Sequence, residues 1–141
     1  MGLFTMLFEN YESNRFIGRL EKIKNSVEMY MILILLTLLI LDGIYLGIHS
    51  SFFKSVLERI QGPMKFRLLP AIMVYVYLTL LVYKLIQYKV SDRDVFLLGL
   101  CVYGIYEGTN YAIFNGWPPY LFFVDTLWGG LLLLFTVRFN R

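Results

Sequence analysis

Three acidic residues, Asp42, Glu107 and Asp125, stand inside long apolar stretches of the sequence. A carboxyl group within a membrane-spanning segment is costly, so such a residue is a candidate for a functional site. Three carboxyls held close together in a low dielectric cannot all stay ionised, and at least one should hold a proton. Shared protons of this kind suit proton relay, cation binding or acid–base chemistry.

Polar and aromatic residues accompany the acids at spacings of three and four, which put side chains on one face of a helix. These patterns predict a polar pocket whose main residues are Asp42, Glu107, Asn110, Asp125 and Trp128. Its expected secondary lining is Tyr45, Tyr75, Tyr103 and Thr109. No catalytic residue is assigned from these patterns.

The composition is that of a membrane protein. Hydrophobic residues make up 58% of the 141 residues, and charged residues make up only 16%. The net charge of +3 comes from Lys and Arg scattered between apolar runs, which is typical of the flanks of membrane spans and not of a nucleic-acid surface. The chain has one His, one Cys and no Gly-rich phosphate loop, so we expect neither a metal nor a cofactor.

The predicted fold is an all-α membrane protein, a bundle of four transmembrane helices. At 1.5 Å per residue, each apolar run is about long enough to cross a membrane core of roughly 30 Å. The expected spans are residues 27–49, 66–88, 95–115 and 120–137, which together form one domain of residues 27–141. Short amphipathic helices are expected on the membrane surface, one in the basic tail of residues 1–26 and one at residues 50–61.

The positions of the acids within the spans predict a common depth. Asp42, Glu107 and Asp125 lie roughly 10, 12 and 8 Å from the same membrane face. Nine Lys and Arg residues fall on the side of the two termini and four on the other side. The positive-inside rule then makes both termini cytoplasmic, with the pocket open to the opposite side.

A structural interpretation of the acids remains open beside the functional one. The acids could hydrogen-bond neighbouring helices, Trp128 or backbone groups and thereby fix the packing of the bundle. The Trp128 N–H needs a partner at its depth, and Asp42 and Glu107 are the candidates. Trp117 is expected in the aromatic belt at the membrane surface.

Four blocks of the sequence resemble the small membrane proteins of domain-of-unknown-function family 2177. They are residues 41–47 (LDGIYLG), 106–110 (YEGTN), 117–118 (WP) and 125–129 (DTLWG). The resemblance extends over about residues 29–134 and implies the four-span fold and its polar blocks, but no activity. Where the family usually has Trp and Asp, this chain has Tyr45 and Glu107. The basic N-terminal extension is also not typical of the family.

Three functions are compatible with these features. The first is a small-solute or proton/cation-coupled binding or carrier protein with an outward-facing acidic pocket. The second is a membrane enzyme that uses Glu107 and Asp125 as an acid–base pair on a lipid-soluble substrate. The third is a structural or assembly subunit without a ligand. A carrier of only four helices favours a homodimer, with the glycine-bearing face of the third span as the expected interface.

Overall fold

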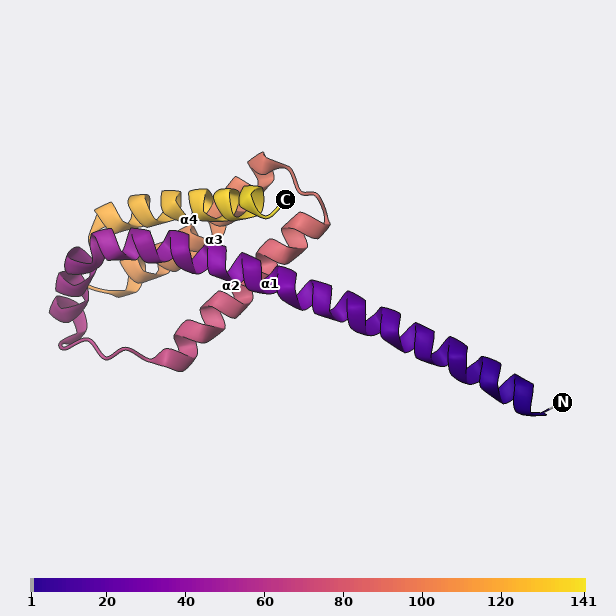
Figure 1. Cartoon of the computed structure of the whole chain (residues 1–141). Coiled ribbons are helices and arrows are strands. Elements are labelled where there is room, and N and C mark those ends of the chain that lie inside the picture. Colours follow the sequence, from indigo (N-terminus) through magenta and orange to yellow (C-terminus); the bar gives the residue numbers. More distant parts are fainter. Residues whose placement is uncertain (1) are drawn as a thin grey trace. The chain divides into compact units, whose positions relative to one another are not determined.

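The computed structural model describes the backbone of residues 2–141 and the side chains of residues 15–141, so part of the predicted basic tail lies outside the described side chains. Four helices follow one another: α1 (Gly2–Gln61), α2 (Leu68–Gln87), α3 (Asp92–Ile113) and α4 (Pro119–Phe139) (Figure 1). No strand occurs in residues 2–141. The contacts divide the chain into two compact units, Met1–Leu33 and Ile34–Arg141, and every candidate pocket residue belongs to the second unit.

Local sequence signals set the helix ends. The observed ends of α2, α3 and α4 lie within three residues of the predicted spans. Ser91 caps α3, because its Oγ accepts a hydrogen bond from the Asp94 backbone N–H at 3.2 Å. Pro119 begins α4, where its missing N–H costs nothing. Gly62, with a φ of +78°, ends α1 immediately before Pro63.

The first span and the segment after it form one continuous helix. The predicted boundaries at residues 27 and 50 fall inside α1, which contains no proline to interrupt its hydrogen bonds. Figure 1 shows the C-terminal end of α1 turning away from the preceding part of the helix. Near this turn the Ser50 Oγ donates a hydrogen bond to the Gly47 carbonyl at 2.9 Å, an interaction that bends helices. The location of residues 50–61 at the membrane surface stays a prediction.

Helices α3 and α4 form a closely packed antiparallel pair (Figure 1). Glycines of α3 make the close approach possible. A Cβ at Gly99 would lie 2.8 Å from the Gly130 Cα, and a Cβ at Gly104 would lie 3.3 Å from a Thr126 methyl group. The glycine-bearing face of α3 is therefore occupied by α4. It is not available for a second copy of the chain, and this corrects the expected homodimer interface.

Three helices of the described residues are long and apolar enough to cross a membrane. They are Arg15–Gln61, Leu68–Gln87 and Pro119–Phe139. Helix α3 has the necessary length, 22 residues, but more polar residues. Because α3 runs alongside α4 over the whole of that length, it covers the same depth as α4. The chain is thus an all-α membrane protein with a bundle of four helices.

An ion-pair cluster joins the start of α3 to the end of α4. Asp92, which precedes the predicted span, bonds Arg138 at 2.7 Å and Arg141 at 2.6 Å. Arg141 also donates a hydrogen bond to the Val90 carbonyl. The hydrogen bond from Arg138 lowers the pKa of the Asp92 carboxyl below its ordinary value, and the charges of the two arginines act in the same direction.

The glycine contact predicts a strong effect of a single methyl group. Replacing Gly99 with Ala should push α3 away from α4 and cost about 1–3 kcal/mol of stability through overpacking. Gly43→Ala is the matched control, because a Cβ at Gly43 meets nothing within 4 Å. The melting temperatures of the two variants in the same detergent provide the measurement. Equal melting temperatures would contradict the close packing.

The Asp92 cluster predicts a pH-dependent stability. With its pKa lowered in the folded state, Asp92 stabilises the protein above its unfolded pKa of about 3.9. This stabilisation should be lost as the pH falls through the lower folded value. Asp92→Asn should therefore melt below the parent protein at neutral pH, and the difference should shrink in strong acid. A difference that stays constant with pH would exclude the ion pair as its source.

Candidate functional site

Asp42 is held by donors from two other helices. Its side chain is buried in the middle of α1. The Tyr75 hydroxyl of α2 donates to Oδ2 at 2.8 Å, and the Trp128 indole of α4 donates through Nε1 to Oδ1 at 2.9 Å. Asp42 and Glu107 were the two acceptors expected for the Trp128 N–H, and Asp42 is the one that accepts its hydrogen bond. One carboxyl thus connects α1, α2 and α4.

Asp125 lies one turn from Trp128 on α4 and is also buried. The Tyr45 hydroxyl of α1 donates a hydrogen bond to Asp125 Oδ1. The Tyr45 ring stacks on the Trp128 ring, with centroids 4.5 Å apart and planes 8° apart. The His49 ring also contacts the Tyr45 ring, with centroids 4.4 Å apart and planes tilted by 39°. Tyr45 therefore ties α1 to α4 through both a hydrogen bond and stacking.

Glu107 is the most deeply buried of the three acids, with 1% of its surface exposed. Its Oε2 accepts a hydrogen bond from the Trp117 indole Nε1 at 2.9 Å. Its side chain lies close enough to that of Asp125, across the interface between α3 and α4, for the two carboxyls to interact electrostatically. Two buried carboxyls in such proximity disfavour each other's ionisation, so one of the pair is expected to hold a proton.

Trp117 is part of this site, whereas its sequence position suggested the aromatic belt. Only 6% of its surface is exposed. Its ring packs with Val56 of α1 and Leu121 of α4 in a small apolar cluster. Gly116, with a φ of +86°, reverses the chain after α3 and brings the indole back toward Glu107. The sequence held one indication of this contact. A buried acid needs a hydrogen-bond donor, and Trp117 follows Glu107 by ten residues along the chain.

The remaining predicted residues divide into two groups. Asn110 is 9% exposed and lies one turn beyond Glu107, and its Nδ2 has no hydrogen-bond partner. Tyr103 is half-buried and interacts electrostatically with both aspartates, Asp42 and Asp125. Thr109 does not belong to the site. It is exposed, and its Oγ1 donates back to the Ile105 carbonyl at 2.7 Å.

We call the acids and their donors the carboxyl cluster: Asp42, Glu107, Asp125, Tyr45, Tyr75, Trp117 and Trp128. Every donor in these four bonds is a neutral hydroxyl or indole group, so no bonded cation balances the charge of the acids. Among residues 15–141, no group of three or more His, Cys, Asp or Glu side chains is placed to hold a metal ion. The arrangement can hold and exchange protons.

The sequence of residues 27–138 matches the family described as "Predicted membrane protein (DUF2177)". The chain belongs to this family. The match includes the whole carboxyl cluster and all four predicted spans, and it confirms the resemblance of the four sequence blocks. Residues 1–26 precede the matched region. No curated protein and no solved structure matches the chain.

The donors of Asp42 predict a contrast between two tyrosines of α2. Tyr75→Phe removes one of the two donors to a buried acid and should cost about 1–3 kcal/mol of stability. Tyr77→Phe removes a hydroxyl from a residue that is 63% exposed and should change stability little. Thermal unfolding of both variants in one detergent makes the comparison. Equal losses would show that the Tyr75 hydroxyl does not support Asp42.

Proposed function

We propose that this membrane protein binds protons at the carboxyl cluster and couples their exchange to the binding or movement of a small solute or cation. The closeness of the two buried acids Glu107 and Asp125, on facing helices, carries the proposal. One proton shared by two buried carboxyls is a charge that the protein can release or accept without moving a helix.

Loss of the shared proton creates a need for another positive charge. Two adjacent carboxylates in a low-dielectric site repel each other, and the cost is large unless a cation takes the place of the proton. The indole of Trp117 and the hydroxyl of Tyr45 stabilise the charge by hydrogen bonds alone. Proton release and cation entry at this pair are therefore expected to be linked.

Polar atoms without partners surround the carboxyl cluster. Within the described side chains, Thr79 Oγ1, Asn110 Nδ2 and Thr126 Oγ1 are buried and have no hydrogen-bond partner. Each belongs to a residue next to, or one turn away from, a member of the cluster. Buried polar groups normally have protein or water partners. These atoms support access of water or a small polar solute to the site.

The proposed orientation places both termini in the cytoplasm. Nine of the 13 Lys and Arg residues lie on the side of the termini, in agreement with the positive-inside rule. In this orientation the turn with Trp117 faces the opposite side of the membrane. Glu107, which Trp117 contacts, is then nearer to that side than to the cytoplasm.

A structural subunit is the second candidate, and the bonding of Asp42 favours it. Two donors from two other helices satisfy this acid, which fits a residue that holds the bundle together. Glu107 and Asp125 differ from Asp42, because each has one neutral donor and lies beside the other acid. Titration of Glu107 therefore separates the two candidates.

The two tryptophans of the chain provide a separate probe for each site, since Trp117 contacts Glu107 and Trp128 contacts Asp42. Protein labelled with ¹⁵N-Trp should give two indole N–H signals, which Trp117→Phe and Trp128→Phe would assign. On titration with acid and base, the Trp117 signal should shift in a step that Glu107→Gln abolishes. Replacing choline with sodium should move this step to lower pH if a cation replaces the proton.

The thermal stability of the Glu107→Gln variant distinguishes the proton-binding function from the structural one. Glu107→Gln keeps the shape of the side chain, so under the proposed function the melting temperature should change little while the titration step disappears. A structural role of an ionised Glu107 instead predicts a loss of about 1–3 kcal/mol. That loss, together with a Trp117 signal that never titrates in the parent protein, would refute proton binding.

A further inference from the structure

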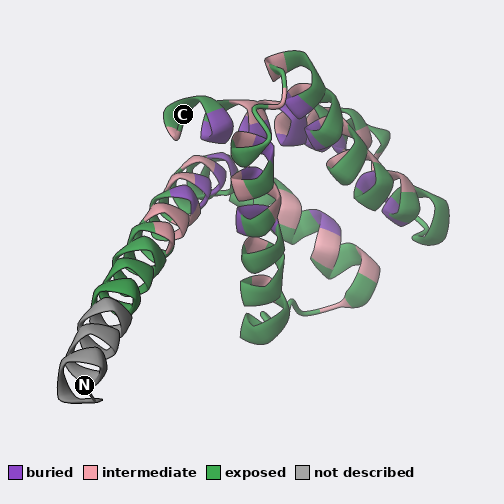
Figure 2. Cartoon of the chain, turned by 90° about the vertical axis from the view of Figure 1, so that its right-hand side faces the viewer, coloured by how far each residue is buried: buried purple, intermediate pink, exposed green. Residues whose placement is uncertain are grey.

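An apolar stripe runs along the part of α1 that lies in the first unit. Its members Phe16, Leu20, Ile23 and Val27 follow one another at spacings of four, three and four residues, so they share one face of the helix. Phe16 and Ile23 expose about 60% of their surface and Leu20 exposes 49%. Figure 2 shows this part of the helix as exposed, beyond the residues that are not described.

Basic residues border the stripe on both sides. At 100° per residue, Arg19 lies on one edge of the stripe and Lys24 lies on the other. Lys24 is 3.7 Å from Glu28, but its side chain remains 73% exposed. Residues 15–26 hold four basic residues and one acid, a net charge of +3.

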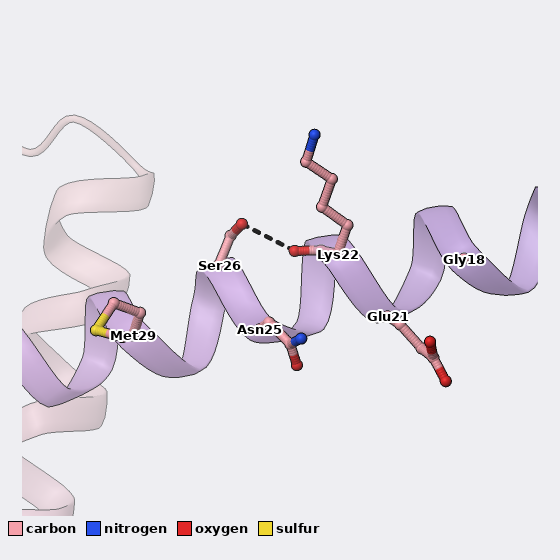
Figure 3. A pocket seen from close by; sticks show the side chains of 6 residues that line it. All are labelled: Gly18, Glu21, Lys22, Asn25, Ser26 and Met29. Carbon is pink, nitrogen blue, oxygen red and sulfur yellow. Dashed lines mark hydrogen bonds between the residues drawn. The ribbon is translucent and has the colours of Figure 1, made fainter.

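The opposite face of the helix is polar. Figure 3 shows the side chains of this face following one another along the helix from Gly18: Glu21, Lys22, Asn25 and Ser26, with Met29 as its apolar member. All these residues belong to α1, and the Ser26 hydroxyl bonds the helix's own backbone at the Lys22 carbonyl, at 2.8 Å. The helix is therefore amphipathic, with one apolar face between two basic edges.

We propose that the surface formed by Phe16, Leu20, Ile23 and Val27, with Arg19 and Lys24 at its edges, docks on the anionic headgroups of the membrane that holds the chain. Because α1 continues into the predicted span at residue 27, this docking requires the helix to bend near that residue, so that the apolar side chains enter the boundary between headgroups and acyl chains. The basic edges reach the phosphate and carboxylate groups beside them. Amphipathic helices bind anionic membranes through these two contributions.

The basic residues beside the apolar stripe disfavour a second copy of the chain as the partner that covers it. The spacing of the stripe would also fit a coiled-coil dimer. In a parallel dimer, however, the flanking residue Arg19 would lie opposite Lys24 of the second copy, and like charges at these positions disfavour pairing. An anionic surface complements both edges at once.

Except for Val27, this surface lies outside the residues that match the family. The family match begins at residue 27, and the basic edges end at Lys24. Lipid docking by residues 16–24 is therefore an addition to the common four-helix unit. It does not depend on whether the carboxyl cluster binds protons.

A fluorescence experiment on the full-length chain tests the proposal. Single cysteines at Leu20 or Asn25, in a Cys101→Ser background, carry an environment-sensitive dye. The protein is reconstituted in neutral phosphatidylcholine vesicles or in vesicles that also contain phosphatidylserine. We expect a quencher attached to the acyl chains to quench the dye at Leu20 more than at Asn25. The difference should grow with the phosphatidylserine content.

Charge variants separate the basic edges from the overall charge. Arg19→Gln and Lys24→Gln should each lower the ratio of docked to undocked helix about fivefold in phosphatidylserine vesicles. Lys54→Gln and Lys65→Gln remove the same charge from exposed positions elsewhere and should leave this ratio unchanged. An equal effect of all four substitutions would overturn the assignment of the basic edges.

Two further results would overturn the proposal as a whole. One is equal quenching at Leu20 and Asn25 at every phosphatidylserine content. The other is a short distance between spin labels at Leu20 of two copies, in neutral and anionic vesicles alike. That distance would assign the apolar stripe to a second copy of the chain.

Discussion

A buried carboxyl group must find hydrogen-bond donors, and the arrangement of the second unit follows from supplying donors to three such groups. Asp42 on α1 receives them from α2 and α4, while Asp125 on α4 receives one from α1. Glu107 receives one from the turn after α3. In a membrane, apolar side chains gain little by leaving lipid for protein, so polar contacts and close packing hold helices together. The carboxyl cluster supplies such contacts between all four helices.

The contact between Glu107 and Asp125 depends in turn on the glycines of α3. Gly104 and Gly108 stand before and after Glu107 in the sequence, and a Cβ added to them would lie 3.3 Å from the Thr126 methyl group and 3.4 Å from the Phe122 ring of α4. Larger residues at these positions would separate the two helices. The carboxyls would then be too far apart to share a proton. The chemistry of the acid pair and the packing of the helix pair are therefore two aspects of one interface.

Much of this organisation is predictable from the sequence, because it depends on local signals. Apolar runs predicted the ends of α2, α3 and α4 to within three residues, although α1 extends beyond its predicted span at both ends, and the three acids in apolar surroundings are all buried. Contacts that depend on how helices meet were not predictable in this way. The indole of Trp117 reaches Glu107 only because the turn reverses, and the glycine face of α3 is filled by α4. The position of Thr109 outside the site was predictable from helix geometry. Thr109 follows Glu107 by two residues, over which a helix turns by about 200°, so the two side chains lie on opposite faces.

The identity of the donors determines where a proton in the carboxyl cluster can go. An indole N–H only donates, so neither Trp117 nor Trp128 can pass a proton onward by accepting another. A phenol oxygen both donates and accepts. Under the proposed function, Tyr45, bonded to Asp125, and Tyr75, bonded to Asp42, are therefore the donors that can pass a proton on, whereas the two tryptophans cannot. Under the proposed function, a proton enters or leaves the cluster past its two tyrosines, on α1 and α2, and not past its two indoles.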